Sequence, residues 1–361
     1  MASLIGLLII SAGESGVEEP VTNQLISAKK SAETVSLKVM NTIYEEVKTP
    51  FKYGVVLKGD NNEHVLCPNV FSNNGKWFMV YVSFNGVGYQ THLAESENLI
   101  EWNPKGTLLS FRNSGWDQWQ VSGGVALMDY SWGSSNTLEK FKDRYWFSYI
   151  GGAFKGREPD PLAIGIAYTD NLTSPGELIR VPQNPVLSSK DPDARSFEKM
   201  TLYKSNIIWD KSNTLGHPFV MFYNGKIKSG YEKIGIAVSD DMIYWRRYGS
   251  NAVVANGENE GYGISGDPQI VKIGDVWVMF YFGAGWSSGG AFDTFACSYD
   301  LVNWRKWMGP HLVEPSEPWD KIAAHKPWII KHDGIVYHFY HAKGNQGQVI
   351  GLATSIDLKS D

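Results

Sequence analysis

The chain has 361 residues, enough for a large hydrophobic core, and a single all-β domain of this length is ordinary. Its net charge is only −5, from 33 basic and 38 acidic residues, which excludes a protein that binds nucleic acid through a basic surface. The 14 Trp and 18 Tyr residues suit the core of a protein rich in β-strands.

We expect the N-terminal segment to lie outside the repeated β-strand region. Residues 4–10 are apolar and small residues follow them, which resembles the hydrophobic region of a signal peptide. We therefore interpret residues 1–13 as a signal-peptide remnant and expect a secreted or periplasmic protein. The apolar run is too short to span a membrane. Residues 14–50 are predicted to be a spacer that ends in a short helix over 36–47.

From residue 51 onwards, one unit recurs about five times. Each copy has a short apolar strand, a turn, an aromatic strand, a third strand that often reads Ile-Gly-Ile-Ala, and in several copies a closing Trp. Repeats of roughly 40–60 residues with several strands each are typical of β-propellers. We predict an all-β fold, a five-bladed β-propeller over residues 51–361. The copies open at Cys67, Ser122, Lys204, Asp267 and Lys326.

The last copy ends after its third strand, at the C-terminal end of the chain. An incomplete blade leaves an unpaired edge that can pair with another molecule. The remaining strand-like run is 53–57, just ahead of the first copy. We therefore expect this N-terminal strand to close the ring.

In a propeller, the first strands of all blades begin around one central axis. Aligning the openings brings lysine, histidine, carboxylate and amide side chains to that axis, and such groups are costly to bury without a ligand. The predicted ligand-binding residues here are Asn69, Lys204, Asn206, His325 and Lys326.

The segments that lead into the first strands carry further polar and aromatic residues. Asp117, Trp119 and Gln120 precede the second opening, and Arg195 precedes the third. Aromatic platforms with carboxylates and cations are typical of carbohydrate sites, so these residues join the predicted substrate-binding set.

Cleavage of a glycosidic bond requires two carboxyl groups, one on each side of the bond. Asp267 is the first candidate, because it lies on the predicted axis beside a Pro. Glu198 is the predicted partner, since neighbouring aromatic residues can raise its pKa into the range of a proton donor. Asp193 is the third catalytic candidate.

The chain resembles the five-bladed propeller glycoside hydrolases, in particular the family 43 β-xylosidases and α-L-arabinofuranosidases. The resemblance covers roughly residues 50–358 and rests on the Cys67-Pro68 and Asp267-Pro268 openings, the Ile-Gly-Ile-Ala strands, and the closures over 239–245 and 298–304. Family 43 enzymes carry acidic residues at their first three openings, where this chain has Cys67, Ser122 and Lys204. The resemblance therefore implies that the acidic residues have moved to Asp267 and the loops.

We expect a glycoside hydrolase that removes terminal sugars from plant or algal polysaccharides. One alternative is a glycoside phosphorylase, because the chain also resembles the family 130 mannoside phosphorylases more distantly, and Lys204, Lys326, His325 and Arg195 are suited to phosphate. The other is a non-catalytic carbohydrate-binding propeller. The expected partner is an oligosaccharide or polysaccharide, with no nucleic acid. No cofactor is expected, and a structural Ca²⁺ or Na⁺ in the axial channel is left open.

Overall fold

The computed structural model consists mainly of β-strands, which confirms the predicted all-β class. The chain divides into two units, Met1–Glu33 and Thr34–Asp361. The structure describes residues 34–60, 63–172, 176–257, 261–286 and 290–360, all of them in the second unit. The predicted signal-peptide remnant, residues 1–13, lies outside the described residues.

One α-helix, α2 (Leu37–Val47), is present in the described part of the chain, where the sequence predicts a short helix. The Ser36 side chain caps it by accepting a hydrogen bond from the Val39 N–H at 3.3 Å. Its apolar face is buried, and the Tyr44 ring stacks on Trp307 at 5.2 Å between centroids. The helix is therefore part of the folded unit.

The strands form consecutive antiparallel groups along the chain. The first group is β2 (His64–Asn73), β3 (Lys76–Phe84), β4 (Tyr89–Ser96) and β5 (Asn103–Leu109). The second is β6 (Gln120–Val125), β7 (Tyr145–Gly152), β8 (Ala163–Thr169), β9 (Ile179–Arg180) and β10 (Leu187–Ser188). After the 3₁₀ helix η1 (Ser196–Glu198), the third is β11 (Thr201–Trp209), β12 (Phe219–Lys228), β13 (Tyr231–Ser239) and β14 (Arg246–Tyr248).

The fourth group is β15 (Gly263–Ile273), β16 (Val276–Ala284), β17 (Phe292–Ser298) and β18 (Arg305–Lys306). The last group combines β19 (Ala323–His332), β20 (Ile335–Gly344) and β21 (Gly347–Thr354) with β1 (Phe51–Leu57) from the other end of the sequence. β1 pairs antiparallel with β21, from Phe51 opposite Thr354 to Leu57 opposite Ile350. The outer strand of this group thus comes from the N-terminal side of the fold.

A turn with the same hydrogen bonds follows the third strand of three groups. In the fourth group, Ser298 Oγ contacts Asp300, whose carboxylate accepts the Val302 N–H at 2.9 Å, and Trp304 Nε1 donates to the Leu301 carbonyl at 2.7 Å. The turn places Leu301 at a positive φ of 67°. Leu99 and Met242 take the corresponding place in the first and third groups, with φ of 67° and 71°. The repeated closing Trp of the sequence is therefore an anchor for this turn.

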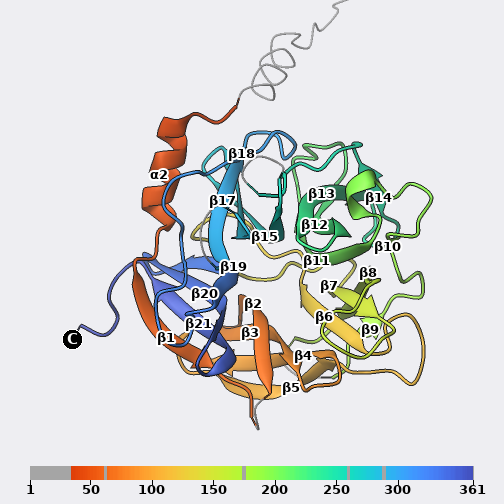
Figure 1. Ribbon diagram of the computed structural model, residues 1–361, viewed down its shortest axis with the longest axis horizontal. Coiled ribbons are helices and arrows are strands. Elements are labelled where there is room, and N and C mark those ends of the chain that lie inside the picture. The colour runs from red at the N-terminus through yellow and green to blue at the C-terminus, as the bar shows by residue number, and fades with distance from the viewer. Residues whose placement is uncertain (1–33, 61–62, 173–175, 258–260, 287–289, 361) are drawn as a thin grey trace, which may run out of the picture. The chain divides into compact units, whose positions relative to one another are not determined.

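The first strands of the groups lie next to one another, as Figure 1 shows for β2, β6, β11, β15 and β19. Polar side chains connect them: Asn206 Oδ1 accepts the Ile270 N–H at 3.0 Å, and Gln269 exchanges two hydrogen bonds with Ile329. Trp328 Nε1 donates to the Val70 carbonyl at 2.8 Å, which joins β19 to β2. First and last groups are thus in direct contact.

The connection between β6 and β7, residues 126–144, runs across the C-terminal ends of the first strands. It forms hydrogen bonds with residues near those ends in four groups, namely Ser72, Ile207, Lys272 and Lys331. These ends are opposite the ends at which the first strands begin. The connection therefore ties the groups together on one side and leaves the other side to the site described below.

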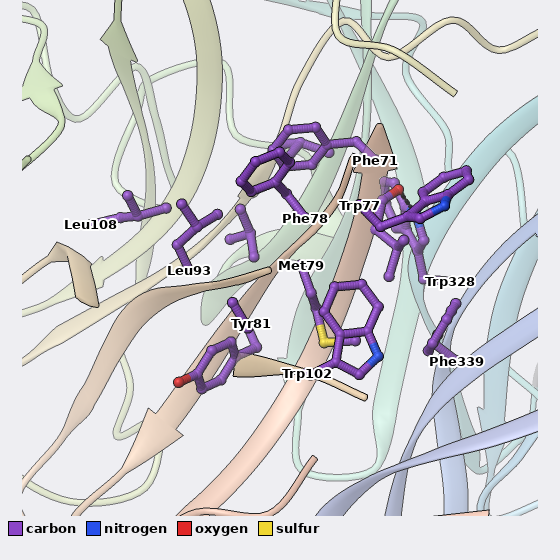
Figure 2. Close-up of a cluster of buried hydrophobic side chains, with 14 of the residues drawn as sticks. Phe71, Trp77, Phe78, Met79, Tyr81, Leu93, Trp102, Leu108, Trp328 and Phe339 are labelled. Carbon is purple, nitrogen blue, oxygen red and sulfur yellow. Dashed lines mark hydrogen bonds between the residues drawn. The ribbon is translucent and has the colours of Figure 1, made fainter. Parts of the chain in front are cut away.

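Aromatic residues fill the space between neighbouring groups. Figure 2 shows Phe71, Phe78 and Met79 of the first group packed near Trp328 and Phe339 of the last. The rings of Trp102 and Phe339 meet edge to face at 5.9 Å. Full burial of one such side chain contributes about 1.5–3 kcal/mol to the free energy of unfolding.

Candidate active site

Three first strands carry the same backbone irregularity three or four residues after they begin. Cys67, Asp267 and Lys326 each precede a Pro, have positive φ of 54°, 52° and 62°, and lie where the strand register shifts. Lys204 lies at a register shift in β11. A bulge turns a side chain out of the regular pleat, and Pro suits it because Pro has no N–H to give to the ladder. The four positions aligned in the sequence therefore share a register shift in the structure.

The bulges bring Asp267 and Lys326 together. Lys326 Nζ lies 3.4 Å from Asp267 Oδ2 and 3.9 Å from Glu158 Oε1, a residue of the β7–β8 loop. The Lys326 side chain is 14% exposed and the Asp267 side chain 5%. Burial alone lowers the pKa of Lys326, but Asp267, Cys67 and Glu158 raise it, and the net pKa is well above its ordinary value. Lys326 is therefore a cation held between two carboxylates.

Asn224, on β12, links Asp267 to a second buried acid. Its Oδ1 accepts the Asp267 N–H at 3.3 Å, and its Nδ2 donates to Glu232 Oε2 at 2.8 Å. The close approach needs glycine at 266, since a Cβ there would lie 2.7 Å from Asn224 Nδ2. Burial raises the pKa of Glu232 to about 7, although the Asn224 hydrogen bond lowers it. Glu232 thus has the pKa of a general acid at neutral pH.

Two histidines flank Lys326. The rings of His325 and His341 are 4.5 Å apart, and burial together with Lys326 lowers the pKa of His325 to about 3. Burial also lowers the pKa of His341 well below its ordinary value. In the amide orientation that satisfies both neighbours, Gln348 donates to His341 Nε2 at 3.1 Å and accepts from Arg157. Both histidines are therefore neutral hydrogen-bonding groups.

Further polar groups border the same region. Lys226 Nζ lies 2.9 Å from both Asp160 Oδ2 and the Tyr203 hydroxyl. Burial raises the pKa of the Tyr203 hydroxyl, as do the nearby Glu232 and Glu158. Burial also raises the pKa of the Cys67 thiol, so Cys67 is no nucleophile at neutral pH. We call Glu158, Asn224, Glu232, Asp267 and Lys326 the central site.

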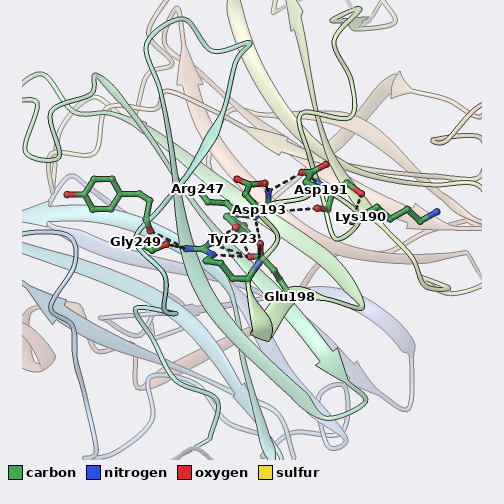
Figure 3. Close-up of polar contacts among 10 residues, drawn as sticks. Lys190, Asp191, Asp193, Glu198, Tyr223, Arg247 and Gly249 are labelled. Atoms are coloured by element: carbon green, nitrogen blue, oxygen red, sulfur yellow. Dashed lines mark hydrogen bonds and ion pairs between the residues drawn. The ribbon is translucent and has the colours of Figure 1, made fainter.

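Several predicted residues lie in a different cluster, which Figure 3 shows around Arg247. The Arg247 guanidinium pairs with Asp191 at 3.0 Å, with Asp193 at 2.7 Å and with Glu198. Arg195 pairs with the same Glu198 at 3.3 Å and donates to the Tyr248 carbonyl. The contacts of Glu198, Asp193 and Arg195 in the described part of the chain include none with Asp267. The structure thus places two predicted catalytic carboxylates in ion pairs outside the central site.

The residues predicted before the second opening act on the local fold. Asp117 is fully buried and accepts hydrogen bonds from Tyr149 and Arg180, both at 3.0 Å. Gln120 Nε2 donates to the Phe154 and Gly156 carbonyls at 2.7 and 3.0 Å, which holds the loop that carries Glu158. The Trp119 ring is half-buried and has the Lys155 ammonium 4.5 Å from its centroid.

Asn69 and Asn206, both predicted to bind substrate, are buried between strands. Asn69 Oδ1 accepts the Val125 N–H at 3.0 Å, and Asn206 does the same for Ile270. Lys204 packs at the centre, its Cε 3.5 Å from the place of a Cβ at Gly124. Of the predicted set, Asp267 and Lys326 therefore belong to the central site, and His325 and Lys204 lie next to it.

Sequence reasoning missed Glu158, Asn224 and Glu232. Glu232 stands at the start of a third strand, and Asp293 and Gln348 are also buried polar residues at the start of theirs. Polar residues shared at the start of the third strand were the sequence signal that could have identified Glu232. Glu158 lies in a loop rich in charge, Gly and Pro, but the sequence does not show that this loop reaches Lys326.

The central site has the groups for acid–base chemistry on a glycosidic bond. Glu232, with its raised pKa, is suited to donate a proton, and Asp267 and Glu158 place two further carboxyl groups beside the Lys326 ammonium. In the described part of the chain, no cluster of three His, Cys, Asp or Glu side chains is arranged to hold a metal ion. No helix within the described residues is long and apolar enough to cross a membrane.

No family model matches the sequence, and no curated protein matches it. Among solved structures, a complex of BT0996 with RGII is 46% identical to the chain and has a TM-score of 0.85. The match covers 90% of this chain and 96% of that one. A structure described as "Glycoside hydrolase" gives the same values. A glycosyl hydrolase from Bacteroides ovatus, 14% identical with a TM-score of 0.64 over 86% of this chain and 95% of that one, shares the fold. The protein belongs to the glycoside hydrolase family of the first two structures, and it is a glycosidase.

Proposed function

We propose that this glycosidase removes a terminal sugar, with Glu232 as the proton donor and Asp267 or Glu158 as the second carboxylate. The observation that carries the proposal is the pair of buried acids joined by Asn224, of which Glu232 has a pKa of about 7 and Asp267 faces Lys326. Glycoside cleavage requires a proton donor and a second carboxyl group, one on each side of the scissile bond.

The proposed architecture is a five-bladed β-propeller in which β1 closes the last blade and residues 51–361 form the catalytic domain. The consecutive antiparallel groups, the β1–β21 pairing and the contact of β19 with β2 support it. In this arrangement the 126–144 connection lies across the far end of the axis. A polysaccharide then enters from one end only, which favours removal of terminal sugars over cleavage within a polymer.

The proposed substrate is a plant or algal polysaccharide, and its first candidate is RGII, because a 46% identical protein is described in complex with it. We also propose that the protein is secreted or periplasmic, since such substrates are large and extracellular. The phosphorylase alternative has less support, because Arg195 is held by Glu198 and Lys326 by Asp267, which leaves no assembled phosphate site among these residues.

Digestion of an RGII oligosaccharide tests the proposal, with products separated by chromatography. We expect one monosaccharide and an oligosaccharide shorter by one unit, at the same rate with and without inorganic phosphate. Internal fragments would contradict the exo mode, and a sugar 1-phosphate would indicate a phosphorylase. If RGII gives no product, the same digestion is repeated with a panel of other polysaccharides.

A further inference from the structure

A cavity of about 310 Å³ lies beside the loop that carries Glu158. Its lining is mostly apolar and includes Trp116, Ala153, Phe154, Pro161 and Leu162, with Lys190 as a charged residue. The volume is at the lower end of the range for small-molecule sites, and apolar walls with few polar groups are typical of them. The central site does not include these residues, so the cavity needs its own explanation.

The Trp116 wall of the cavity is held in place by a buried network. The Trp116 ring stacks on Tyr149 at 5.6 Å, and glycine at 151 permits its approach, because a Cβ there would lie 2.3 Å from the ring. The Tyr149 hydroxyl and Arg180 Nε both donate to the fully buried Asp117, each at 3.0 Å. A ring packed in this way is preorganised.

Another part of the lining, Ser188 and Lys190, is held by the cluster in Figure 3. Arg247 Nη2 donates to the Ser188 carbonyl at 2.7 Å, and Asp191 Oδ2 accepts the Ser188 N–H at 2.8 Å. Glu198 holds the same guanidinium from the other side. Burying such ions costs desolvation energy, and a fixed binding wall is a reason for this chain to keep them.

Phe154 is the exposed aromatic residue of the cavity lining. Its side chain is 56% exposed, yet its carbonyl is held by Gln120 Nε2 at 2.7 Å. An aromatic ring kept in water on an anchored loop is available for a ligand, and the apolar C–H face of a sugar ring suits it. Lys190, which also lines the cavity, can hydrogen-bond a hydroxyl or carboxylate of the same sugar.

Phe154 and Glu158 are four residues apart in one loop, so their Cα atoms are separated by at most about 14 Å. In the proposed exo mode, the terminal sugar occupies the central site and the rest of the substrate lies outside it. We propose that this cavity is a subsite for a sugar on the leaving-group side of the scissile bond, bound by its apolar face between Trp116 and Phe154. The proposal rests on the proposed function.

The test compares two substrates with the same terminal sugar. One is an RGII oligosaccharide, which reaches the cavity, and the other is the glycosyl fluoride, whose leaving group is too small to reach it. For Phe154→Ala, we expect the ratio of kcat/KM for the oligosaccharide to that for the fluoride to fall about tenfold, the equivalent of 1.4 kcal/mol. Ala153→Trp, which fills the cavity, should lower the ratio as well.

Tyr244→Ala is the matched control, because Tyr244 is 69% exposed and does not line the cavity. It should leave the ratio unchanged. An unchanged ratio in both cavity variants would overturn the subsite. If the wild type hydrolyses neither substrate, the proposed function fails instead, and calorimetric binding of the oligosaccharide to wild type and Phe154→Ala then decides the subsite: equal affinities would overturn it.

Discussion

At the scale of single residues, the central site depends on charges that are buried in unequal surroundings. Glu232 has a partner that only donates a hydrogen bond, whereas Asp267 faces the Lys326 cation. Burial raises the pKa of Glu232 by more than the Asn224 hydrogen bond lowers it, and a nearby cation favours the ionised form of a carboxyl group. Two acids of the same chemistry are thereby suited to different roles.

Replacing Asp267 by Asn should lower kcat/KM by about a thousandfold, the usual scale for loss of a catalytic carboxylate. The amide keeps the shape but removes the charge that faces Lys326. Kinetics with an activated aryl glycoside measure the loss, and circular dichroism checks the fold. Activity close to that of the wild type would remove Asp267 from the mechanism.

Glu232 predicts the pH dependence of the enzyme. Its carboxyl is protonated up to a pKa of about 7, so activity should fall as the pH rises through about 7. The unfolded carboxyl has an ordinary pKa of 4.5, so between pH 4.5 and 7 the unfolded state loses its proton first and stability falls as the pH rises. Glu232→Gln should be inactive and, at pH 8, more stable by an amount on the order of 3 kcal/mol. Denaturation at pH 4 and pH 8 measures this, and an equal change at both would contradict it.

Lys204 and Lys326 lead to a prediction about the effect of charge in the substrate. Lys326 already has two carboxylates, whereas the described residues show no ion-pair partner for Lys204. An anionic substrate group would satisfy Lys204 through charge-assisted hydrogen bonds. Lys204→Met should therefore weaken anionic glycosides about tenfold more than matched neutral ones, and Lys326→Met should impair both. Equal losses in Lys204→Met would contradict an anionic ligand.

At the scale of elements, β1 makes the strand pairing with the largest separation in sequence, because its partner β21 lies about 300 residues away. Without it, β21 would present unpaired backbone groups and invite aggregation.

A truncation that starts at residue 34 should stay folded and active, because the folded unit begins at Thr34 and Val35 is already buried against it. A truncation that starts at residue 58 should aggregate. Size-exclusion chromatography and activity distinguish the two products. A monomeric, active protein that starts at residue 58 would contradict a closing role for β1.

At the scale of the whole molecule, hydrogen bonds between first strands hold the groups together. Asn206→Ala leaves the buried Ile270 N–H without its acceptor, so we expect a loss of about 1–3 kcal/mol in the free energy of unfolding. Urea denaturation measures it, with the exposed Asn113→Ala as control. If Asn206 binds substrate instead, KM should change while stability does not.

The sequence by itself determined the repeat and the all-β class, because apolar strand patterns and closing Trp motifs are local features, and its resemblance to propeller glycoside hydrolases indicated the family. It also identified Asp267 and Lys326, although the first strands that carry them begin three to four residues earlier than the sequence predicts. The pattern of apolar residues and turns within each copy indicates where its strands lie.

Only the tertiary structure decided which acids meet. Glu198 is adjacent to a first strand in sequence, but Arg195 and Arg247 hold it elsewhere. Glu232 lies more than 30 residues from Asp267 in sequence and reaches it through Asn224. A carboxyl group's role depends on its burial and on the charges around it, and both arise from contacts between strands that are distant in sequence.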